Sequence, residues 1–315
     1  MINEENYYSI ENALKFMSAS QFKSFQNCEA QALAETKGVF RREYTNALAV
    51  GSYVDSFIEG TLDQFKEKHP EIFTLKGTLR SEYCQAEELC KRIAKDEMFM
   101  KYLGGEHQKI FLGKIANVDF KGKLDAYHEN KCIVDLKTCK DFEPVWKNGH
   151  KISFIEAWGY DIQGAIYQEL VYQNTGKKLP FFICAVTKEK NPNIAIISIP
   201  QERLDMCLEI VKANAPRYND IKHGKVEPTK CCKCDYCRSV KKIKNIIDYR
   251  DLNPELFTDK QLQAIQEPVS VSSIISLPAI ENAHTGENNA SSVETKLEKK
   301  KHKKKKKSKV IVIKL

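Results

Sequence analysis

The sequence predicts an α/β fold in which helices flank a central mixed β-sheet. Amphipathic helical patterns come first, and three short strand patterns separated by turn residues follow them. A long helical pattern then precedes two further strands and a last helix. Consecutive antiparallel strands joined to helix–strand units are typical of a layered α/β core. From Pro268 onward the chain is rich in Ser, Asn and Lys without periodicity, which predicts a disordered tail.

The first part of the chain is predicted to be helical. Ser18 or Ser20 suits the N-cap of a first helix, and Cys28 lies inside that helical pattern. A second helix contains Gly51 to Asp55. A third, amphipathic helix is expected from Glu82 to Leu103.

The strand patterns begin after this third helix. Because turn residues separate the first three strands, we expect them to form an antiparallel meander. The predicted strands are 109–118, 122–128, 132–139, 181–187 and 194–199. Two helices complete the pattern, at 152–174 and 201–221.

Composition limits the class of protein. The chain has 315 residues, enough for a substantial core, and lacks both an 18-residue apolar run and an apolar leader at Met1, so we expect a cytoplasmic protein with no membrane partner. Its eleven cysteines are therefore expected to be reduced thiols or metal ligands. In the tail, eleven lysines stand against four glutamates, which leaves about +1 of the formal net charge of +8 for the rest of the chain.

One stretch, Gly122 to Thr138, combines two acids and a lysine. Asp125 and Asp135 are ten positions apart, and Lys137 follows the second acid by two, on the same face of a strand. Two carboxylates can hold Mg²⁺ or Mn²⁺, and a nearby ammonium group steadies the charge of a phosphodiester under attack. The alternative is an ordinary solvated sheet face with alternating charges.

The register of the predicted hairpin decides whether the two acids can meet. A two-residue loop at Glu129 and Asn130 would set Asp125 beside Val134, on the wrong face. A three-residue loop, or a bulge with Asn130 or a neighbour at positive φ, makes paired residue numbers sum to 260 and sets Asp125 opposite Asp135. The catalytic interpretation therefore requires this second register.

Four of the cysteines crowd together near residue 234. Cys231, Cys234 and Cys237 have the Cys-x₂-Cys-x₂-Cys spacing found in iron–sulfur ligation, while zinc would also need four ligands. Consecutive cysteines seldom reach one metal together, so Cys28 is the candidate fourth ligand rather than Cys232. An iron–sulfur cluster, with 4Fe–4S as the expected form, zinc and free thiols all remain open.

The segments GKLDAY and IVDLKT together resemble the core motif of the PD-(D/E)xK nuclease superfamily. The resemblance implies a restriction-endonuclease-like core, with Asp125 and Asp135 as metal ligands and Lys137 as the catalytic lysine. Leu124 stands where the motif usually has proline.

Three further segments are similar to the RecB-like branch of this superfamily. Gln163 and Tyr167 fit its Q-x-x-x-Y helix, which implies contact with DNA. Gly51 to Asp55 fits a G-x-x-x-H element in which Asp55 replaces a metal-binding histidine. The cysteines resemble those of the branch's iron–sulfur nucleases, and GSYVD, WGYDIQGAIYQE and CKCDYCRSVKK are most similar to the phage RecE or exonuclease VIII-like group.

This resemblance implies an Mg²⁺-dependent exonuclease that resects linear duplex DNA from 5′ ends. It also implies a single-strand annealing protein as partner and a homo-oligomer. The change of composition at Pro268 gives the expected bounds of an exonuclease domain at 1–267 and a tail at 268–315. The alternatives are an end-trimming iron–sulfur nuclease of the CRISPR adaptation type and an inactive DNA-binding accessory protein. A nucleic-acid motor is not expected, because the chain has no G-x-x-x-x-G-K-[ST] loop for ATP.

Overall fold

The structure is a computed structural model, and it describes residues 2–43, 45–147, 149–243, 246–252 and 256–258. The chain divides into a first unit that ends at Ile243 and a second unit that starts at Lys244. The predicted tail and the domain boundary before it lie outside the described residues. In the described part of the chain, every helix is too short or too polar to cross a membrane.

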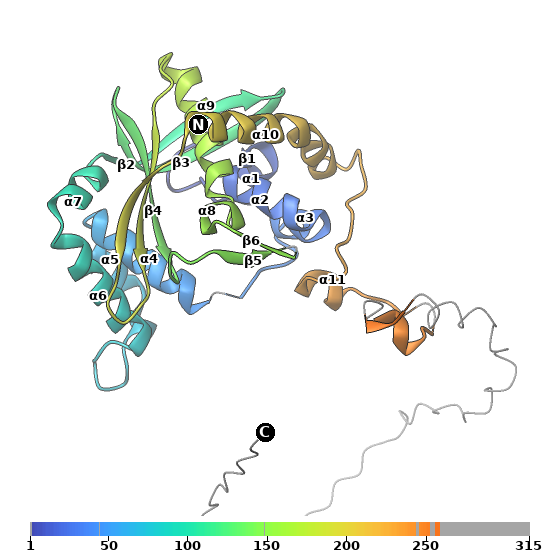
Figure 1. The fold of residues 1–315 in the computed structure, drawn as a ribbon, viewed down its shortest axis with the longest axis horizontal. Coiled ribbons are helices and arrows are strands. Elements are labelled where there is room, and N and C mark those ends of the chain that lie inside the picture. Colours follow the sequence, from blue (N-terminus) through green and yellow to red (C-terminus); the bar gives the residue numbers. More distant parts are fainter. Residues whose placement is uncertain (1, 44, 148, 244–245, 253–255, 259–315) are drawn as a thin grey trace, which may run out of the picture. The chain divides into compact units, whose positions relative to one another are not determined.

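A mixed six-stranded sheet forms the centre of the first unit (Figure 1). Its strands follow the order β1-β3-β4-β7-β8, and β2 pairs with β3. The β1–β3 and β4–β7 pairs are parallel and the others antiparallel. The strands are β1 (Met17–Ser18), β2 (Glu106–Ile115), β3 (Val118–His128), β4 (Cys132–Cys139), β7 (Phe181–Thr187) and β8 (Ile194–Ser198). The mixed sheet and the β2–β3–β4 meander confirm the predicted fold class.

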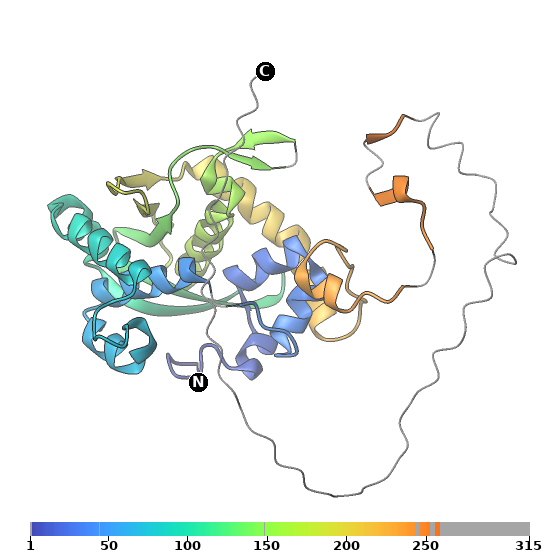
Figure 2. The ribbon, with the colours of Figure 1, turned by 90° about the horizontal axis from the view of Figure 1, so that it is seen from below.

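Helices cover both faces of this sheet (Figures 1 and 2). Alternate strand residues point to opposite faces, so Ile183 and Ala185 join one hydrophobic cluster while Cys184 and Val186 join another. The first cluster contains side chains of α2 (Ala19–Asn27), α9 (Tyr160–Thr175) and α10 (Gln201–Lys222). The second contains side chains of α4 (Asn46–Ile58), α6 (Ser81–Ala94) and α7 (Glu97–Leu103).

Shorter elements connect these layers. The strands β5 (Val145–Lys147) and β6 (His150–Ile152) form a separate two-stranded hairpin before α8 (Phe154–Ala157). The other short helices of the first unit are α1 (Ile10–Lys15), α3 (Glu29–Thr36), α5 (Leu62–Lys68), η1 (Pro70–Ile72) and α11 (Asp235–Ser239). The second unit contains η2 (Tyr249–Leu252).

Three predicted helices are interrupted in the structure. Cys28 is extended, with φ −164°, and separates α2 from α3, so its predicted place inside a helix is wrong. The helix expected from Glu82 to Leu103 is two helices, because the Asp96 side chain accepts a hydrogen bond from the Phe99 amide and starts α7. Gly159, at φ 61°, separates α8 from α9 within the range 152–174.

The predicted strands at 109–118 and 122–128 differ from β2 and β3 at the turn that joins them, and β3 begins at Val118 rather than at Gly122. The pattern at 109–118 was expected to be a single strand, but Ala116 and Asn117 have φ of 48° and 62° and form the turn between β2 and β3. Two consecutive residues at positive φ are typical of a tight hairpin turn. The strand expected at 181–187 is confirmed as β7.

Gly164 on α9 provides a test of how closely this helix packs on the sheet. A Cβ at this position would lie 2.5 Å from Cδ1 of the buried Phe181 ring, so we expect Gly164→Ala to lower the free energy of unfolding by about 1–3 kcal/mol. The measurement is urea denaturation. Gly51→Ala, on α4, is the control because its Cβ would meet Thr138 Oγ1 at an ordinary 3.5 Å. Equal stability of the two variants would contradict this packing.

Candidate active site and cysteine cluster

The candidate active site lies where β4 parts from β3. The two strands pair through Ala126–Val134, Tyr127–Ile133 and His128–Cys132, and each pair sums to 260. The loop has three residues with Asn130 at φ 60°, so the register that the catalytic interpretation requires is confirmed. The ladder ends just before Asp125 and Asp135, which leaves room between the strands for their side chains.

The gap beside β3 is bounded by β1 at one end and by β4 at the other. The β2 strand pairs with one edge of β3 along its length, so β1 and β4 share the other edge. There β1 pairs at Phe120 and Lys121, and β4 pairs from Ala126 onward. Within the described residues, positions 122–125 of β3 therefore have no strand partner on this edge.

Asp125 takes the place of a strand partner in this gap. Its Oδ2 accepts a hydrogen bond of 2.9 Å from the Leu136 amide, which the parted ladder would otherwise leave unpaired. Burial raises the pKa of Asp125 well above its usual value, and the neighbouring Asp135 raises it further. The carboxyl group is thus held in a place where its negative charge is costly.

Asp135 and Lys137 form a buried ion pair on one face of β4. Lys137 Nζ contacts Asp135 Oδ2, and Asp135 is 1% exposed. Burial opposes the charge of Lys137, but Asp135 and Asp125 outweigh that effect and raise its pKa. Apart from this ion pair, Asp135 Oδ2 accepts no hydrogen bond from the described residues.

Gln163 of α9 supports Asp135 from the helix side. Its Nε2 donates to Asp135 Oδ1 at 2.7 Å and to the Tyr167 hydroxyl at 3.2 Å. Its Oε1 accepts from Lys23 Nζ of α2 at 3.0 Å. Gln163 and Tyr167 are each 9% exposed, so the structure brings both predicted DNA-binding residues to the carboxylates, and their contact with DNA stays a prediction.

Asp55 approaches the same carboxylates from α4. It lines a small pocket together with Asp125 and with Glu59, His107 and Gln108, which were not predicted to belong to the site. Burial raises the pKa of Asp55 to about 7, and the carboxyl groups of Glu59 and Asp135 contribute to the rise. The predicted third acid is therefore near the site.

These residues fit a hard divalent cation. Asp55, Asp125 and Asp135 offer carboxylate oxygens, which Mg²⁺ and Mn²⁺ prefer. Lys137 supplies one positive charge to Asp135. Within the described residues, the buried Asp135 Oδ2 has only the ion-pair contact with Lys137 and no further hydrogen-bond donor. Buried like charges of this kind are stabilised when a cation neutralises them.

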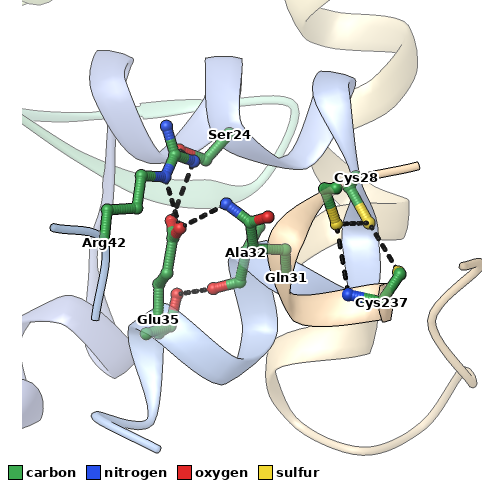
Figure 3. Close-up of polar contacts among 9 residues, drawn as sticks. Ser24, Cys28, Gln31, Ala32, Glu35, Arg42 and Cys237 are labelled. Carbon is green, nitrogen blue, oxygen red and sulfur yellow. Dashed lines mark hydrogen bonds and ion pairs between the residues drawn. The ribbon is translucent and has the colours of Figure 1, made fainter. Parts of the chain in front are cut away.

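The four predicted cysteine ligands also meet. Cys28, Cys231, Cys234 and Cys237 place their sulfur atoms within 4.8 Å of one another. Cys28 Sγ lies 3.6 Å from Cys237 Sγ (Figure 3). It lies 3.7 Å from Cys234 Sγ. Around one tetrahedral zinc ion with Zn–S bonds of about 2.3 Å, neighbouring sulfurs stand about 3.8 Å apart.

Backbone conformation and hydrogen bonds position the chain around the cysteine cluster. Cys28 reaches it because the chain is extended between α2 and α3, which corrects its predicted helical setting without moving it from the ligand set. The Lys233 and Cys234 amides donate to Cys231 Sγ and lower the pKa of this thiol to about 6. Arg217 of α10 and the Thr229 amide both bind Glu29, next to Cys28. Cys232, at φ 59°, remains exposed beside the set.

Comparison with known proteins gives the family of this chain. Residues 18–240 match the profile of a PDDEXK-like domain of unknown function, DUF3799. The chain belongs to this PDDEXK-like family. A crystal structure of a "Putative exonuclease" from Eubacterium rectale is 44% identical, with a TM-score of 0.77, over 80% of this chain and 98% of that one. No curated protein matches the chain.

The PDDEXK-like domain therefore includes both groups of candidate residues. The matched range begins at Ser18, the N-cap of α2, and ends after α11, so it contains the carboxylates and all four clustered cysteines. Sequence reasoning missed Lys23 and Tyr160, whose ring centre lies 5.3 Å from Lys137 Nζ. Tyr160 lies in the segment WGYDIQGAIYQE but was given no role there, and only the packing of α2 against α9 brings Lys23 to Gln163.

Substitution of Gln163 tests whether its side-chain amide stabilises the buried Asp135 carboxylate. We expect Gln163→Met to lower the free energy of unfolding in EDTA by about 1–3 kcal/mol, because Asp135 loses its amide donor. Tyr167→Phe, which removes only the hydroxyl that accepts at 3.2 Å, should cost less than about 1 kcal/mol. Urea denaturation measures both. If Gln163→Met is as stable as the parent chain, the residue does not support Asp135.

The cysteine cluster offers a test of metal binding. We expect metal analysis of anaerobically purified protein to find bound zinc or iron, and Cys28→Ser and Cys237→Ser to lose it, because each removes one of four ligands. Visible absorbance distinguishes iron–sulfur from colourless zinc. Cys232→Ser is the matched control and should keep the metal. Full metal content in Cys28→Ser would contradict the four-ligand set.

Proposed function

We propose that this PDDEXK-like protein is an Mg²⁺- or Mn²⁺-dependent DNA exonuclease. The observation that supports this proposal best is the meeting of Asp125, Asp135 and Lys137 in the gap between β3 and β4. Two buried carboxylates that share one close ammonium group serve hydrolysis better than they serve stability, because within the described residues no second cation pairs with Asp125.

The roles of the residues follow from their contacts. Asp125 and Asp135 would hold the divalent cation, with Asp55 as a further ligand from α4. A cation bound there would supply a nucleophilic hydroxide and polarise the phosphate. Lys137 lies within reach of the same space and would stabilise negative charge on the phosphate during attack. Gln163 fixes the Asp135 carboxylate by donating a hydrogen bond to it, and it also donates to the Tyr167 hydroxyl.

The direction of digestion comes from resemblance. The RecE-like segments support resection of linear duplex DNA from 5′ ends, which would expose a 3′ strand for a single-strand annealing protein. The similar protein from Eubacterium rectale is named a "Putative exonuclease", which agrees with attack at DNA ends. A homo-oligomer would keep such an enzyme on its substrate.

The cysteine cluster has a structural role in this proposal. As they stand, the sulfur separations suit one tetrahedral ion, whereas an iron–sulfur cluster would require the four cysteines to move apart, since each would bind a different iron atom. Either metal would close the domain by joining the end of α2 to the segment after α10.

Asp125→Asn separates loss of chemistry from loss of folding. We expect release of an end label from linear duplex DNA in Mg²⁺ to fall at least about 100-fold. In EDTA the variant should be no less stable than the parent chain, because an amide oxygen can still accept from Leu136 while the repulsion with Asp135 is removed. Gel assays and thermal unfolding measure the two effects.

Labels on either DNA end complete this experiment. A 5′ label that leaves first supports 5′ resection, and EDTA should abolish the reaction. If the parent chain releases neither label in Mg²⁺ or Mn²⁺, the exonuclease proposal is wrong and the accessory-protein alternative gains support. Unaltered digestion by Asp125→Asn would place the chemistry elsewhere.

A further inference from the structure

A pocket of about 550 Å³ lies next to the candidate active site. Its walls come from α2, the β5–β6 hairpin, the junction of α8 and α9, and α10. The chain has two tryptophans, Trp146 and Trp158, and both line this pocket. They are 68% and 58% exposed, so neither indole contributes its full area to the core. The pocket thus offers two large aromatic surfaces to a ligand.

The charges of the pocket favour an anion. Arg203 pairs with two carboxylates, Asp161 at 2.6 Å and Glu156 at 3.0 Å, and the three cations and two acids that line the pocket leave a net charge of +1. In contrast, Lys147 Nζ donates to the Ala157 carbonyl at 2.9 Å and Lys23 Nζ donates to Gln163 Oε1, which are neutral acceptors. Neither ammonium group has a carboxylate ion-pair partner among the described residues. Burial lowers the pKa of Lys23 to about 8, which leaves it mostly charged at pH 7.

The pocket adjoins the carboxylates through Lys23. The aliphatic part of this side chain crosses Gly159, where a Cβ would lie only 2.9 Å from Lys23 Cδ. Its ammonium group then reaches Gln163, which donates to Asp135. Lys23 Nζ and Lys137 Nζ lie 5.5 and 5.3 Å from the centre of the same Tyr160 ring. One wall of the pocket is thus also a wall of the candidate active site.

Aromatic surfaces beside unpaired ammonium groups match the chemistry of single-stranded DNA. Unpaired bases expose their faces and stack on indoles, while ammonium groups attract the phosphates that connect them. In a duplex, neighbouring base pairs cover these faces. A blunt duplex can therefore use the lysines but cannot stack its internal bases on Trp146 or Trp158.

We propose that this tryptophan pocket holds unpaired bases of the DNA strand that is cut. The inference rests on the proposed nuclease function and specifies its substrate, namely a strand whose bases next to the scissile phosphate are unpaired. The duplex end must then open before cleavage, and frayed or single-stranded ends bind better than blunt ends.

Intrinsic fluorescence tests this proposal directly, because both tryptophans of the full chain report on one pocket. The titration uses oligodeoxythymidylate or a blunt duplex in EDTA, so that no DNA is cut. We expect the single strand to quench the fluorescence and to bind more tightly than the duplex. With fluorescently labelled oligodeoxythymidylate, Trp146→Ala and Trp158→Ala should each weaken binding at least about 5-fold.

Control variants separate stacking from folding. Tyr172→Ala removes an exposed aromatic side chain of α9 that does not line the pocket, and it should bind like the parent chain. Trp146→Phe and Trp158→Phe should retain most of the affinity because phenylalanine still stacks. Unchanged affinity in the double Trp146→Ala, Trp158→Ala chain, or tighter binding of the blunt duplex, overturns the proposal.

The same assays distinguish this inference from the proposed function. A protein that binds single strands through its tryptophans but never releases a DNA label would end the exonuclease proposal and leave the pocket assignment standing. A protein that digests DNA with equal efficiency in the double tryptophan variant would retain the exonuclease proposal and exclude the pocket.

Discussion

Where β4 separates from β3, the carboxyl groups of Asp125 and Asp135 share one buried space, and the surrounding elements of the structure depend on this arrangement. The three-residue loop with Asn130 at positive φ sets the register, and the ladder then stops before the two acids. Asp125 binds the Leu136 amide that the parted ladder leaves unpaired. Two carboxylates thus share a buried space with one close ammonium group, Lys137, and repulsion between them is relieved by a cation.

Support for this space comes from elements far apart in the chain. Gln163 of α9 holds Asp135, and Lys23 of α2 holds Gln163. The same helix α2 ends at Cys28, a member of the cysteine cluster. A metal in the cluster would therefore fix the end of the helix that carries Lys23. The cluster and the carboxylate site are connected through one helix, and the tryptophan pocket lies against that helix as well.

Much of this site could be predicted because its signals are local or periodic. The two acids and Lys137 lie on adjacent strands, so the register alone decides their meeting, and Cys-x₂-Cys-x₂-Cys spacing marks a ligand set. Helix interruptions at Cys28 and Gly159 escaped prediction, since hydrophobic periodicity continues across a single extended or left-handed residue. Lys23 and Trp146 lie outside the motifs and Trp158 begins the segment WGYDIQGAIYQE without any role being predicted for it, and only tertiary packing brings the three together.

Cation binding to the metal-free carboxylate site tests the central claim without relying on DNA cleavage. Thermal unfolding of the full chain is measured with increasing Mn²⁺ or Mg²⁺, which favour oxygen ligands over thiolates. The account predicts that the melting temperature rises with cation concentration in the parent chain and stays constant in the double Asp125→Asn, Asp135→Asn variant. A melting temperature in the parent chain that does not respond to either cation would contradict it.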